Sequence, residues 1–410
     1  MNVSTPGTSR AVDGSLRPRL VPLEPRPIQL QDGSRAVMLR DPYGVLERAA
    51  VVTPAAYWVL AHFDGHRDLD EVMSALVAAG LRGVRREDVE RVAAQASEAG
   101  LVFGPAYRAR HTEALAAFRS RPRAPACAGG AYPDQEVELR EMLAGFYTHP
   151  EGPGARDGRS RSGAGARLVV APHIDFRRGG PAYAHAYHAL EGCDADVYVV
   201  FGTAHASPPH LYTLTRQDYA TPLGPVATDR AVVDALASEL PEEELFADEL
   251  VHSGEHSCEF QMIWLRWVLG DRPFRAVPVL CSSISHLADP AAATERFLTA
   301  LARATRGHKV CCVASADLAH VGPQYGDELA PTRADLAELE AQDRRTLAFL
   351  VKGEPDAFHR DAVVEDERRR LCGVAPIYAA MRASGRGARL LHYSQWTDGA
   401  DMVSFAAAVG

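Results

Sequence analysis

Apolar runs of strand length alternate with helix-length segments from Arg167 to the end of the chain. The apolar runs are Leu168–Ala171, Val197–Phe201, Ala276–Leu280 and Val310–Ala314. The spacing of apolar residues predicts helices at Pro181–Leu190, Ala231–Leu240, Cys258–Leu269, Ala291–Thr305 and Ala334–Lys352. Continuous apolar strands separated by helices are typical of a sheet that is covered on both faces. We therefore predict an α/β fold with a central sheet flanked by helices.

The N-terminal part of the chain shows a different pattern. Thr53-Pro54 is a helix start signal, and apolar residues then recur at helical spacing in three short segments, the last of which ends at Gly100. The strand-like Leu101–Phe103 follows. Three helices and a strand resemble a small winged-helix-like α+β module, and FDGHRDLDEV (Phe63–Val72) is similar to PqqD-type peptide-binding domains. A structural cap or docking domain is the alternative interpretation.

These patterns divide the chain into three parts. Residues 1–26 are rich in Pro and Arg without periodicity, which predicts a disordered N-terminus. Residues 27–118 form the winged-helix-like module, and residues 127–410 form the α/β domain. A basic, Pro-rich linker joins the last two parts.

Composition and charge narrow the class of protein. A hydrophobic fraction of 47% and a charged fraction of 24% are ordinary for a soluble globular protein, and no apolar run is long enough to span a membrane. The net charge of −9 argues against nucleic acid, and we interpret the Arg156–Arg161 stretch as a solvated loop. The chain has seven cysteines, an odd number, and no C-x-x-C motif, which is typical of a reducing compartment. The polar N-terminus lacks a secretory signal. We therefore expect a cytoplasmic protein.

Three of the apolar runs lead into turns that carry histidine. The residues in these turns are His173 and Asp175 after the first run, His205 after the second, and Asp317 and His320 after the fourth. Ligands bind outside the carboxyl ends of the strands in open α/β sheets. A single histidine after a strand is usually a structural hydrogen-bond partner, but three of them with two aspartates favour a shared site.

Three further positions have two interpretations each. Cys372 precedes a helix-like segment and is either a thiolate stabilised at a helix start or a buried inert thiol. Glu255 and His256 either belong to a helix cap that includes Ser257, or orient a metal-bound histidine or contact substrate. Arg177-Arg178 either recognise an anionic substrate or form surface salt bridges.

Several ordered motifs resemble the Memo family, which in bacteria is called AmmeMemoRadiSam system protein B. They are AGGAYP (Ala128–Pro133), APHIDFRRGGPAYAHAY (Ala171–Tyr187), VVFGTAHASPP (Val199–Pro209), YATPLGPVATD (Tyr219–Asp229), EHSCEFQMIWL (Glu255–Leu265), ASADLAH (Ala314–His320) and LCG (Leu371–Gly373). Ala131-Tyr132 stand where the family more often has a Phe-Tyr pair. The N-terminal module lies outside this resemblance.

The resemblance implies a fold similar to class III extradiol dioxygenases, which bind Fe(II) through two histidines and a carboxylate. It implies that His173 and His205 bind a metal, that Cys372 replaces the carboxylate, and that His320 is the acid/base with Asp317 beside it. Two imidazoles and a thiolate leave coordination positions open. We expect a single metal ion, Fe(II) or Cu, with Zn as the alternative. Glu255, His256 and Asp175 are expected around the metal ligands or at the substrate.

Three functional hypotheses follow from these expectations. The leading one is a non-haem metal-dependent oxidoreductase of unknown substrate, with His320 as acid/base. The second is a non-catalytic metal-binding or redox partner protein that works with AMMECR-type and radical-SAM proteins, beside which members of the family are commonly encoded. The third is a zinc-dependent hydrolase with Asp317 or His320 as the base. Catechol ring cleavage does not follow, because the metal ligands differ from those of the dioxygenases.

Overall fold

The computed structural model describes residues 17–46, 48–155, 165–364 and 366–410. The chain divides into two compact units, Met1–Ala117 and Phe118–Gly410, and each is described by itself. The basic stretch Arg156–Arg161 and the first part of the predicted disordered segment, residues 1–16, lie outside the described residues.

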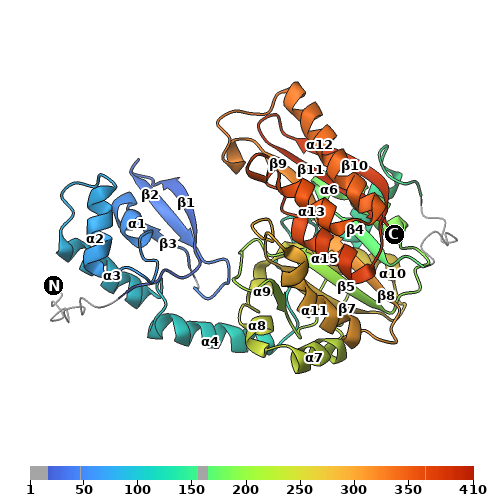
Figure 1. Ribbon diagram of the computed structural model, residues 1–410, viewed down its shortest axis with the longest axis horizontal. Coiled ribbons are helices and arrows are strands. Elements are labelled where there is room, and N and C mark those ends of the chain that lie inside the picture. Colours follow the sequence, from blue (N-terminus) through green and yellow to red (C-terminus); the bar gives the residue numbers. More distant parts are fainter. Residues whose placement is uncertain (1–16, 47, 156–164, 365) are drawn as a thin grey trace. The chain divides into compact units, whose positions relative to one another are not determined.

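The N-terminal unit begins with a three-stranded antiparallel sheet, followed by helices (Figure 1). Its elements are β1 (Glu24–Gln29), β2 (Arg35–Arg40), β3 (Ala50–Val52), α1 (Pro54–Leu60), α2 (Leu69–Ala78), α3 (Arg86–Ala99) and α4 (Pro105–Arg119). Thr53 caps α1 by accepting a hydrogen bond from the N–H of Ala56, as its sequence signal indicates. The sheet was not predicted, and the expected strand Leu101–Phe103 forms only a single bridge, between Val102 and Leu20.

The predicted disorder does not extend over residues 17–26. The N–H of Leu20 donates to the carbonyl of Phe63 at 2.8 Å, and the N–H of Val21 donates to the carbonyl of Leu101 at 3.0 Å. β1 already begins at Glu24. The segment is ordered because its backbone groups find partners elsewhere in the unit, which a local composition cannot reveal.

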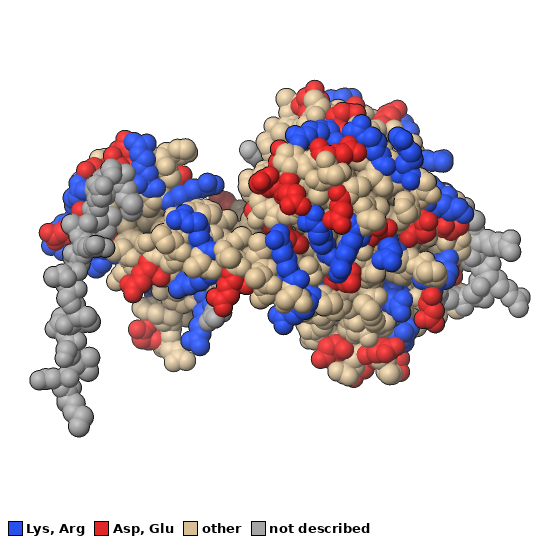
Figure 2. Space-filling view, turned by 90° about the horizontal axis from the view of Figure 1, so that it is seen from below, with Lys and Arg blue, Asp and Glu red and all other residues tan. Residues whose placement is uncertain are grey.

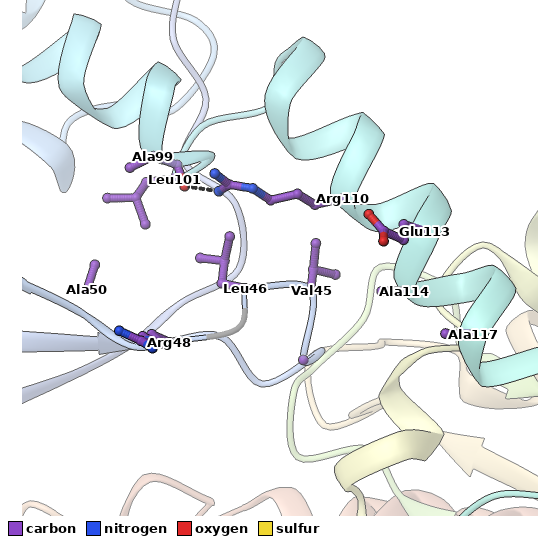
Figure 3. Close-up of a pocket in the computed structure, with 11 residues that line it drawn as sticks. Val45, Leu46, Arg48, Ala50, Ala99, Leu101, Arg110, Glu113, Ala114 and Ala117 are labelled. Carbon is purple, nitrogen blue, oxygen red and sulfur yellow. Dashed lines mark hydrogen bonds between the residues drawn. The ribbon is translucent and has the colours of Figure 1, made fainter.

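The N-terminal unit contains a cavity of about 600 Å³ (Figure 3). It is lined by Ala50 of β3, by the end of α3 and by one side of α4, where Ala114 and Ala117 lie. Arg110 of α4 also lines it and donates a hydrogen bond to the carbonyl of Ala99. The wall therefore combines small and aliphatic side chains with the charged side chains of Arg48, Arg110 and Glu113.

The C-terminal unit is built on a mixed eight-stranded sheet with the order β10-β11-β4-β8-β5-β7-β6, in which β9 pairs with β11. Its strands are β4 (Leu168–Ala171), β5 (Val197–Thr203), β6 (Tyr212–Leu214), β7 (Arg275–Cys281), β8 (Val310–Ser315), β9 (Asp317–Val321), β10 (Arg389–Thr397) and β11 (Met402–Val409). The four predicted apolar runs are the four strands that pair in parallel, β4, β8, β5 and β7. The predicted central sheet with helices is confirmed.

Helices cover the sheet (Figure 1). They are α5 (Glu136–Thr148), α6 (Phe176–His188), α7 (Arg230–Glu239), α8 (Glu242–Phe246), α9 (Val251–Gly254), α10 (His256–Leu269), α11 (Pro290–Ala304), the 3₁₀ turn η1 (Pro323–Tyr325), α12 (Arg333–Lys352), α13 (Pro355–Val363), α14 (Asp366–Arg369) and α15 (Val374–Ser384). The predicted start of α6 at Pro181 is wrong. Asp175 caps the helix by accepting from the N–H of Arg178, so α6 begins at Phe176 and contains the proline.

Successive side chains of the parallel strands point to opposite faces of the sheet, and both faces are buried. Leu168 and Val170 of β4 belong to one apolar core with Ile377 of α15, Leu301 of α11 and Val233 of α7. Val169 and Ala171 are equally buried and point to the opposite face.

Aromatic rings join the helices α6 and α10. Trp264 of α10 stacks on Tyr183 and Tyr187 of α6, with ring centres 5.5 Å apart in both pairs. These contacts set α10 firmly beside α6. The start of α10, at His256, is therefore held in a defined place.

Two surface properties bear on the sequence predictions. None of the helices in the described part of the chain is long and apolar enough to cross a membrane. On the face shown in Figure 2, acidic and basic side chains are interspersed over the C-terminal unit and do not gather into one basic patch.

Candidate metal centre

The two histidines that follow β4 and β5 lie at the same edge of the sheet. Both strands pair in parallel with β8, so β8 lies between them and the three carboxyl ends are adjacent. His173 follows β4 and His205 follows β5 at this edge. The third predicted turn, at Asp317 and His320, is wrong in detail. It forms strand β9, because its residues pair antiparallel with β11.

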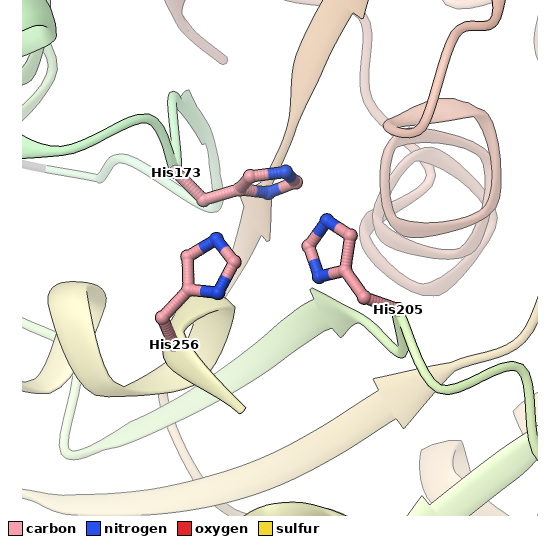
Figure 4. A group of neighbouring side chains, drawn as sticks. All are labelled: His173, His205 and His256. Atoms are coloured by element: carbon pink, nitrogen blue, oxygen red, sulfur yellow. The ribbon is translucent and has the colours of Figure 1, made fainter. Parts of the chain in front are cut away.

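Three imidazole rings meet at this edge, and Figure 4 shows His173, His205 and His256 turned toward one another. One ring nitrogen of each lies within 4.8 Å of the other two. The rings of His205 and His256 are nearly parallel with centres 4.8 Å apart, and the ring of His173 stands across both. Nitrogens around one tetrahedral zinc ion lie about 3.3 Å apart. A small adjustment of the rings is therefore enough to place three nitrogens on one ion.

His173 is held by partners that leave its Nε2 available. Its Nδ1 lies 3.0 Å from the carbonyl oxygen of Ser315, and its backbone N–H donates to Oδ1 of Asp317 at 2.9 Å. A carbonyl oxygen only accepts, so the proton of the neutral ring resides on Nδ1 and the lone pair on Nε2. That Nε2 lies 3.1 Å from the sulfur of Cys372 and 3.6 Å from Oδ2 of Asp317.

Glu255 contacts the other two histidines. Its carboxylate accepts from the backbone N–H of His205 at 2.9 Å, and lies 3.0 Å from Nδ1 of His205 and 3.3 Å from Nδ1 of His256. Burial alone would favour the neutral acid, but the two histidines and a hydrogen bond from Ser257 hold the pKa of Glu255 well below its usual value. A buried carboxylate thus orients His205 through Nδ1 and leaves Nε2 unengaged by Glu255.

The helix cap at α10 differs from the sequence expectation. Glu255 is the N-cap residue, and its side chain accepts from the N–H of Ser257 at 3.0 Å. The hydroxyl of Ser257 instead donates to the carbonyl of Thr203 in β5 at 2.8 Å. One carboxylate therefore caps the helix and contacts His205, and a role beside a metal-bound histidine stays a prediction.

The three rings differ in their affinity for protons. Burial disfavours the imidazolium form of each, but the neighbouring Cys372 and Asp317 raise the pKa of His173 to about 9. Glu255 and Cys372 likewise raise the pKa of His205 well above its usual value. Burial dominates at His256 and lowers its pKa to about 3. His256 is therefore neutral at physiological pH, which is the form that binds metals.

Cys372 lies in the loop between α14 and α15, beside the histidines. Burial favours its thiol form, but the charges of His173 and His320 and hydrogen bonds from His173 and His205 lower the pKa of Cys372 to about 5. At physiological pH the thiolate is therefore the main form. The alternative of an inert buried thiol does not fit this environment.

Glycine at position 373 lets the Cys372 loop approach the sheet. The N–H of Gly373 donates to the carbonyl of Asp317 at 3.1 Å, and the hydroxyl of Thr203 donates to the carbonyl of Cys372 at 3.2 Å. A Cβ atom at position 373 would lie 2.6 Å from the Cβ of Ala316 and would also meet the carbonyl of Asp317. Only the absence of a side chain allows this contact.

The remaining predicted residues lie around the same cavity. Nδ1 of His320 lies 3.1 Å from the carbonyl oxygen of Leu318, so Nε2 of the neutral ring can accept a proton. Asp317 is buried and its carboxylate is engaged with His173. Asp175 caps α6 and pairs with Arg178.

The cavity has a volume of about 510 Å³. Every predicted site residue except Glu255 lines it: His173, Asp175, His205, His256, Asp317, His320 and Cys372. The rest of the wall includes Ile174, Phe260, Tyr325 and Val403, which the sequence did not single out. The cavity thus combines a cluster of metal-binding side chains with an apolar wall.

This donor set fits a transition-metal ion. Imidazole nitrogen and thiolate sulfur suit Zn, Cu and Fe, and histidines whose second nitrogen is held by a carbonyl or carboxylate are typical of metal ligands. The assignment of His173, His205 and Cys372 as the ligands stays a prediction. The structure adds His256 as a candidate donor, whereas the sequence predicted a role around the ligands. The signals for His256 in the sequence were its place beside Glu255 before a predicted helix and the motif EHSCEFQMIWL.

The fold and the site define a class, an α/β protein with a histidine-rich candidate metal centre at the carboxyl edge of its parallel strands. Residues 123–409 match the family of Memo-like proteins, and the chain belongs to this family, which confirms the resemblance. A MEMO1 family protein of Aeropyrum pernix is 31% identical over 286 residues, which cover 67% of this chain and 93% of that protein.

Other relatives match a similar share of the chain. A MEMO1 family protein of Thermus thermophilus is 31% identical over 296 residues, covering 71% of this chain and 82% of that protein. One of Methanothermobacter thermautotrophicus is 29% identical over 266 residues, covering 64% and 87%. The family match begins at residue 123, so the N-terminal unit lies outside it.

Proposed function

We propose that the C-terminal unit is a non-haem metal-dependent oxidoreductase that acts on a small molecule. One Fe or Cu ion would be held by His173, His205 and Cys372, with His256 as a further nitrogen donor. The observation that carries this proposal is the meeting of two oriented imidazoles and a thiolate at one open cavity. A thiolate among the ligands favours soft and borderline metals.

The side chains around the ion would position its ligands and transfer a proton. A bound redox metal would supply electron exchange with dioxygen or another small oxidant. Asp317 and Glu255 keep His173 and His205 in place. His320 would take up a proton at Nε2, because its Nδ1 is held by Leu318. The likeness to class III extradiol dioxygenases supports a redox function over a structural one.

The experiment is anaerobic purification of the full chain, metal analysis, and measurement of oxygen consumption by the Fe- and Cu-loaded protein. We expect one ion per chain and metal-dependent oxygen uptake. Cys372→Ser should weaken metal binding, whereas His320→Ala should leave the metal content unchanged and slow oxygen uptake. Cys281→Ser is the matched control, because Cys281 is buried in β7 and does not line the cavity.

Two outcomes would contradict the proposal. Tight binding of zinc alone with no oxygen uptake would favour the hydrolase or the non-catalytic metal-binding protein. Loss of metal in His320→Ala would show that His320 is a ligand and not an acid/base.

For the N-terminal unit we propose a docking role in a winged-helix-like module. The cavity beside β3 and α4 supports it, because a wall of aliphatic side chains interspersed with Arg48, Arg110 and Glu113 offers both apolar and charged contacts to a segment of another protein. AMMECR-type and radical-SAM proteins are the proposed partners. Ala114→Arg should fill the cavity and reduce copurification with such a partner, while leaving the metal content of the C-terminal unit unchanged. Equal copurification would contradict this role.

A further inference from the structure

Two arginines line the candidate metal cavity, and they use their guanidinium groups differently. Arg370 donates from Nη1 to the carbonyl of His320 at 3.1 Å and to the carboxylate of Asp327 at 3.1 Å, and its Nη2 also donates to Asp327. Arg370 also has a φ of +50°, which is unusual for a residue with a side chain. Both of its terminal nitrogens are engaged, so its role is to hold the loop that leads to Cys372.

Arg178 keeps donors available. Its Nε donates to the carboxylate of Asp175, and within the described part of the chain no residue accepts from its Nη1 or Nη2. The side chain is 34% exposed and lines the cavity. A guanidinium whose two terminal NH2 groups are available in this way can still form a two-pronged hydrogen bond with a carboxylate.

The position of the guanidinium is fixed in advance of any ligand. Arg178 lies in the first turn of α6, where its backbone N–H is bound by the Asp175 cap. Its guanidinium carbon lies 4.7 Å from the centre of the Trp396 ring. Stacking on one face leaves the edge of the group, which carries the donors, free for a planar acceptor.

The rest of the cavity wall suits an apolar body. Ile174 and Val403 lie in the same small apolar cluster, against which Trp396 and Tyr325 pack. Ile174, Val403 and Tyr325 all line the cavity that holds the histidines. A volume of about 510 Å³ is within the range of sites for small organic ligands.

We propose that Arg178 binds the carboxylate of an organic monoanion whose apolar body lies along Ile174, Tyr325 and Val403 toward the histidine cluster. An organic monoanion would be the substrate class of the proposed oxidoreductase, and this part of the inference rests on that proposed function. A monoanion fits better than a phosphate dianion. Asp175 already neutralises part of the charge of Arg178, which leaves less positive charge for a second negative charge on the ligand.

The test uses full-length protein loaded with zinc, so that no redox turnover takes place. The probes are benzoate and benzamide, which share a ring but differ in charge, and binding is measured by calorimetry. We expect benzoate to bind at least about tenfold more tightly than benzamide, the gain of a charge-assisted hydrogen bond. Arg178→Gln should lower benzoate binding to the level of benzamide.

Arg177→Gln is the matched control. Arg177 is the neighbour of Arg178 in the chain, but its side chain is exposed and does not line the cavity. It should bind benzoate as the wild type does. Equal binding of benzoate and benzamide by the wild type, unchanged benzoate binding in Arg178→Gln, or an equal loss in Arg177→Gln would each overturn the inference.

The experiment distinguishes failure of the proposed metal site from failure of carboxylate binding by Arg178. Zinc content is measured in every variant, and Arg178→Gln should retain it, since the backbone cap at Asp175 persists. If the wild type binds no zinc, the metal proposal fails. The same pair of probes and variants then tests Arg178 in the metal-free protein.

Discussion

The carboxylate of Glu255 lies 3.0 Å from Nδ1 of His205 and accepts the backbone N–H of the same residue at 2.9 Å. One acidic side chain therefore fixes both the ring and the backbone of a candidate ligand. Glu255→Gln should lower metal affinity by about 10–100-fold, because the uncharged amide supports His205 less well. Competition with a chelator measures this change.

Glu138→Gln is the control for that substitution, since Glu138 is exposed on α5. Its metal affinity should equal that of the wild type. Unchanged affinity in Glu255→Gln would mean that the contact with His205 serves only to cap α10.

Cys372 and Cys127 line the same cavity but should differ in reactivity. The pKa of Cys372 is lowered to about 5, whereas burial and the neighbouring Glu259 raise the pKa of Cys127 to about 12. In metal-free protein, iodoacetamide should modify Cys372 with a rate that rises through about pH 5 and is constant above it, because the thiolate is the nucleophile. Mass spectrometry of the peptides identifies the site.

A bound metal should protect Cys372 from this modification, if the sulfur is a ligand. Modification of Cys127 at neutral pH, or equal modification of Cys372 with and without metal, would contradict the assignment.

Metal binding should release protons, because His173 must lose one to bind. Its pKa is raised to about 9, so the ring is protonated below that pH, and the proton competes with the metal. Affinity should therefore rise with pH from about 6 up to at least about 9, because His205, whose pKa is also raised well above its usual value, must lose a proton as well. Cys372, with a pKa of about 5, is already deprotonated over this range.

Calorimetry at about pH 7.5 in buffers of different ionisation heat measures the number of protons released. We expect at least one proton per metal ion. A binding enthalpy that does not depend on the buffer would show that the protein releases no proton when the metal binds, which would contradict this prediction.

Gly373→Ala should destabilise the C-terminal unit by about 1–3 kcal/mol, the usual cost of inserting a group into a packed site. The added Cβ would lie 2.6 Å from the Cβ of Ala316. It would also push the Cys372 loop away from the histidines, so metal affinity should fall as well. Urea denaturation and chelator competition measure the two effects.

Gly145→Ala is the matched control, because Gly145 lies within α5 and nothing lies within 4 Å of an added Cβ. Alanine in a helix interior is more favourable by about 0.5–1 kcal/mol, so this variant should be as stable as the wild type or more so. Equal stability of the two variants would contradict the close approach at Gly373.

Much of the C-terminal fold could be predicted from the sequence, for a physical reason. The strands β4, β5, β7 and β8 are buried on both faces, so their apolar runs are continuous and mark them plainly. β10 is half-buried along its length and shows no such run, and the sequence did not identify it. β10 forms because it pairs with β11, and this pairing between two segments cannot be read from the sequence of β10 alone.

The sequence by itself determined that histidines follow the first two parallel strands of the sheet, because buried runs and polar turns leave a local trace. Only the tertiary structure decided that β8 separates β4 and β5, which brings His173 and His205 together. It alone placed His256 beside them and left the two terminal NH2 groups of Arg178 without an acceptor among the described residues, since packing between distant segments sets which side chains meet. Such packing has no local signature in the chain.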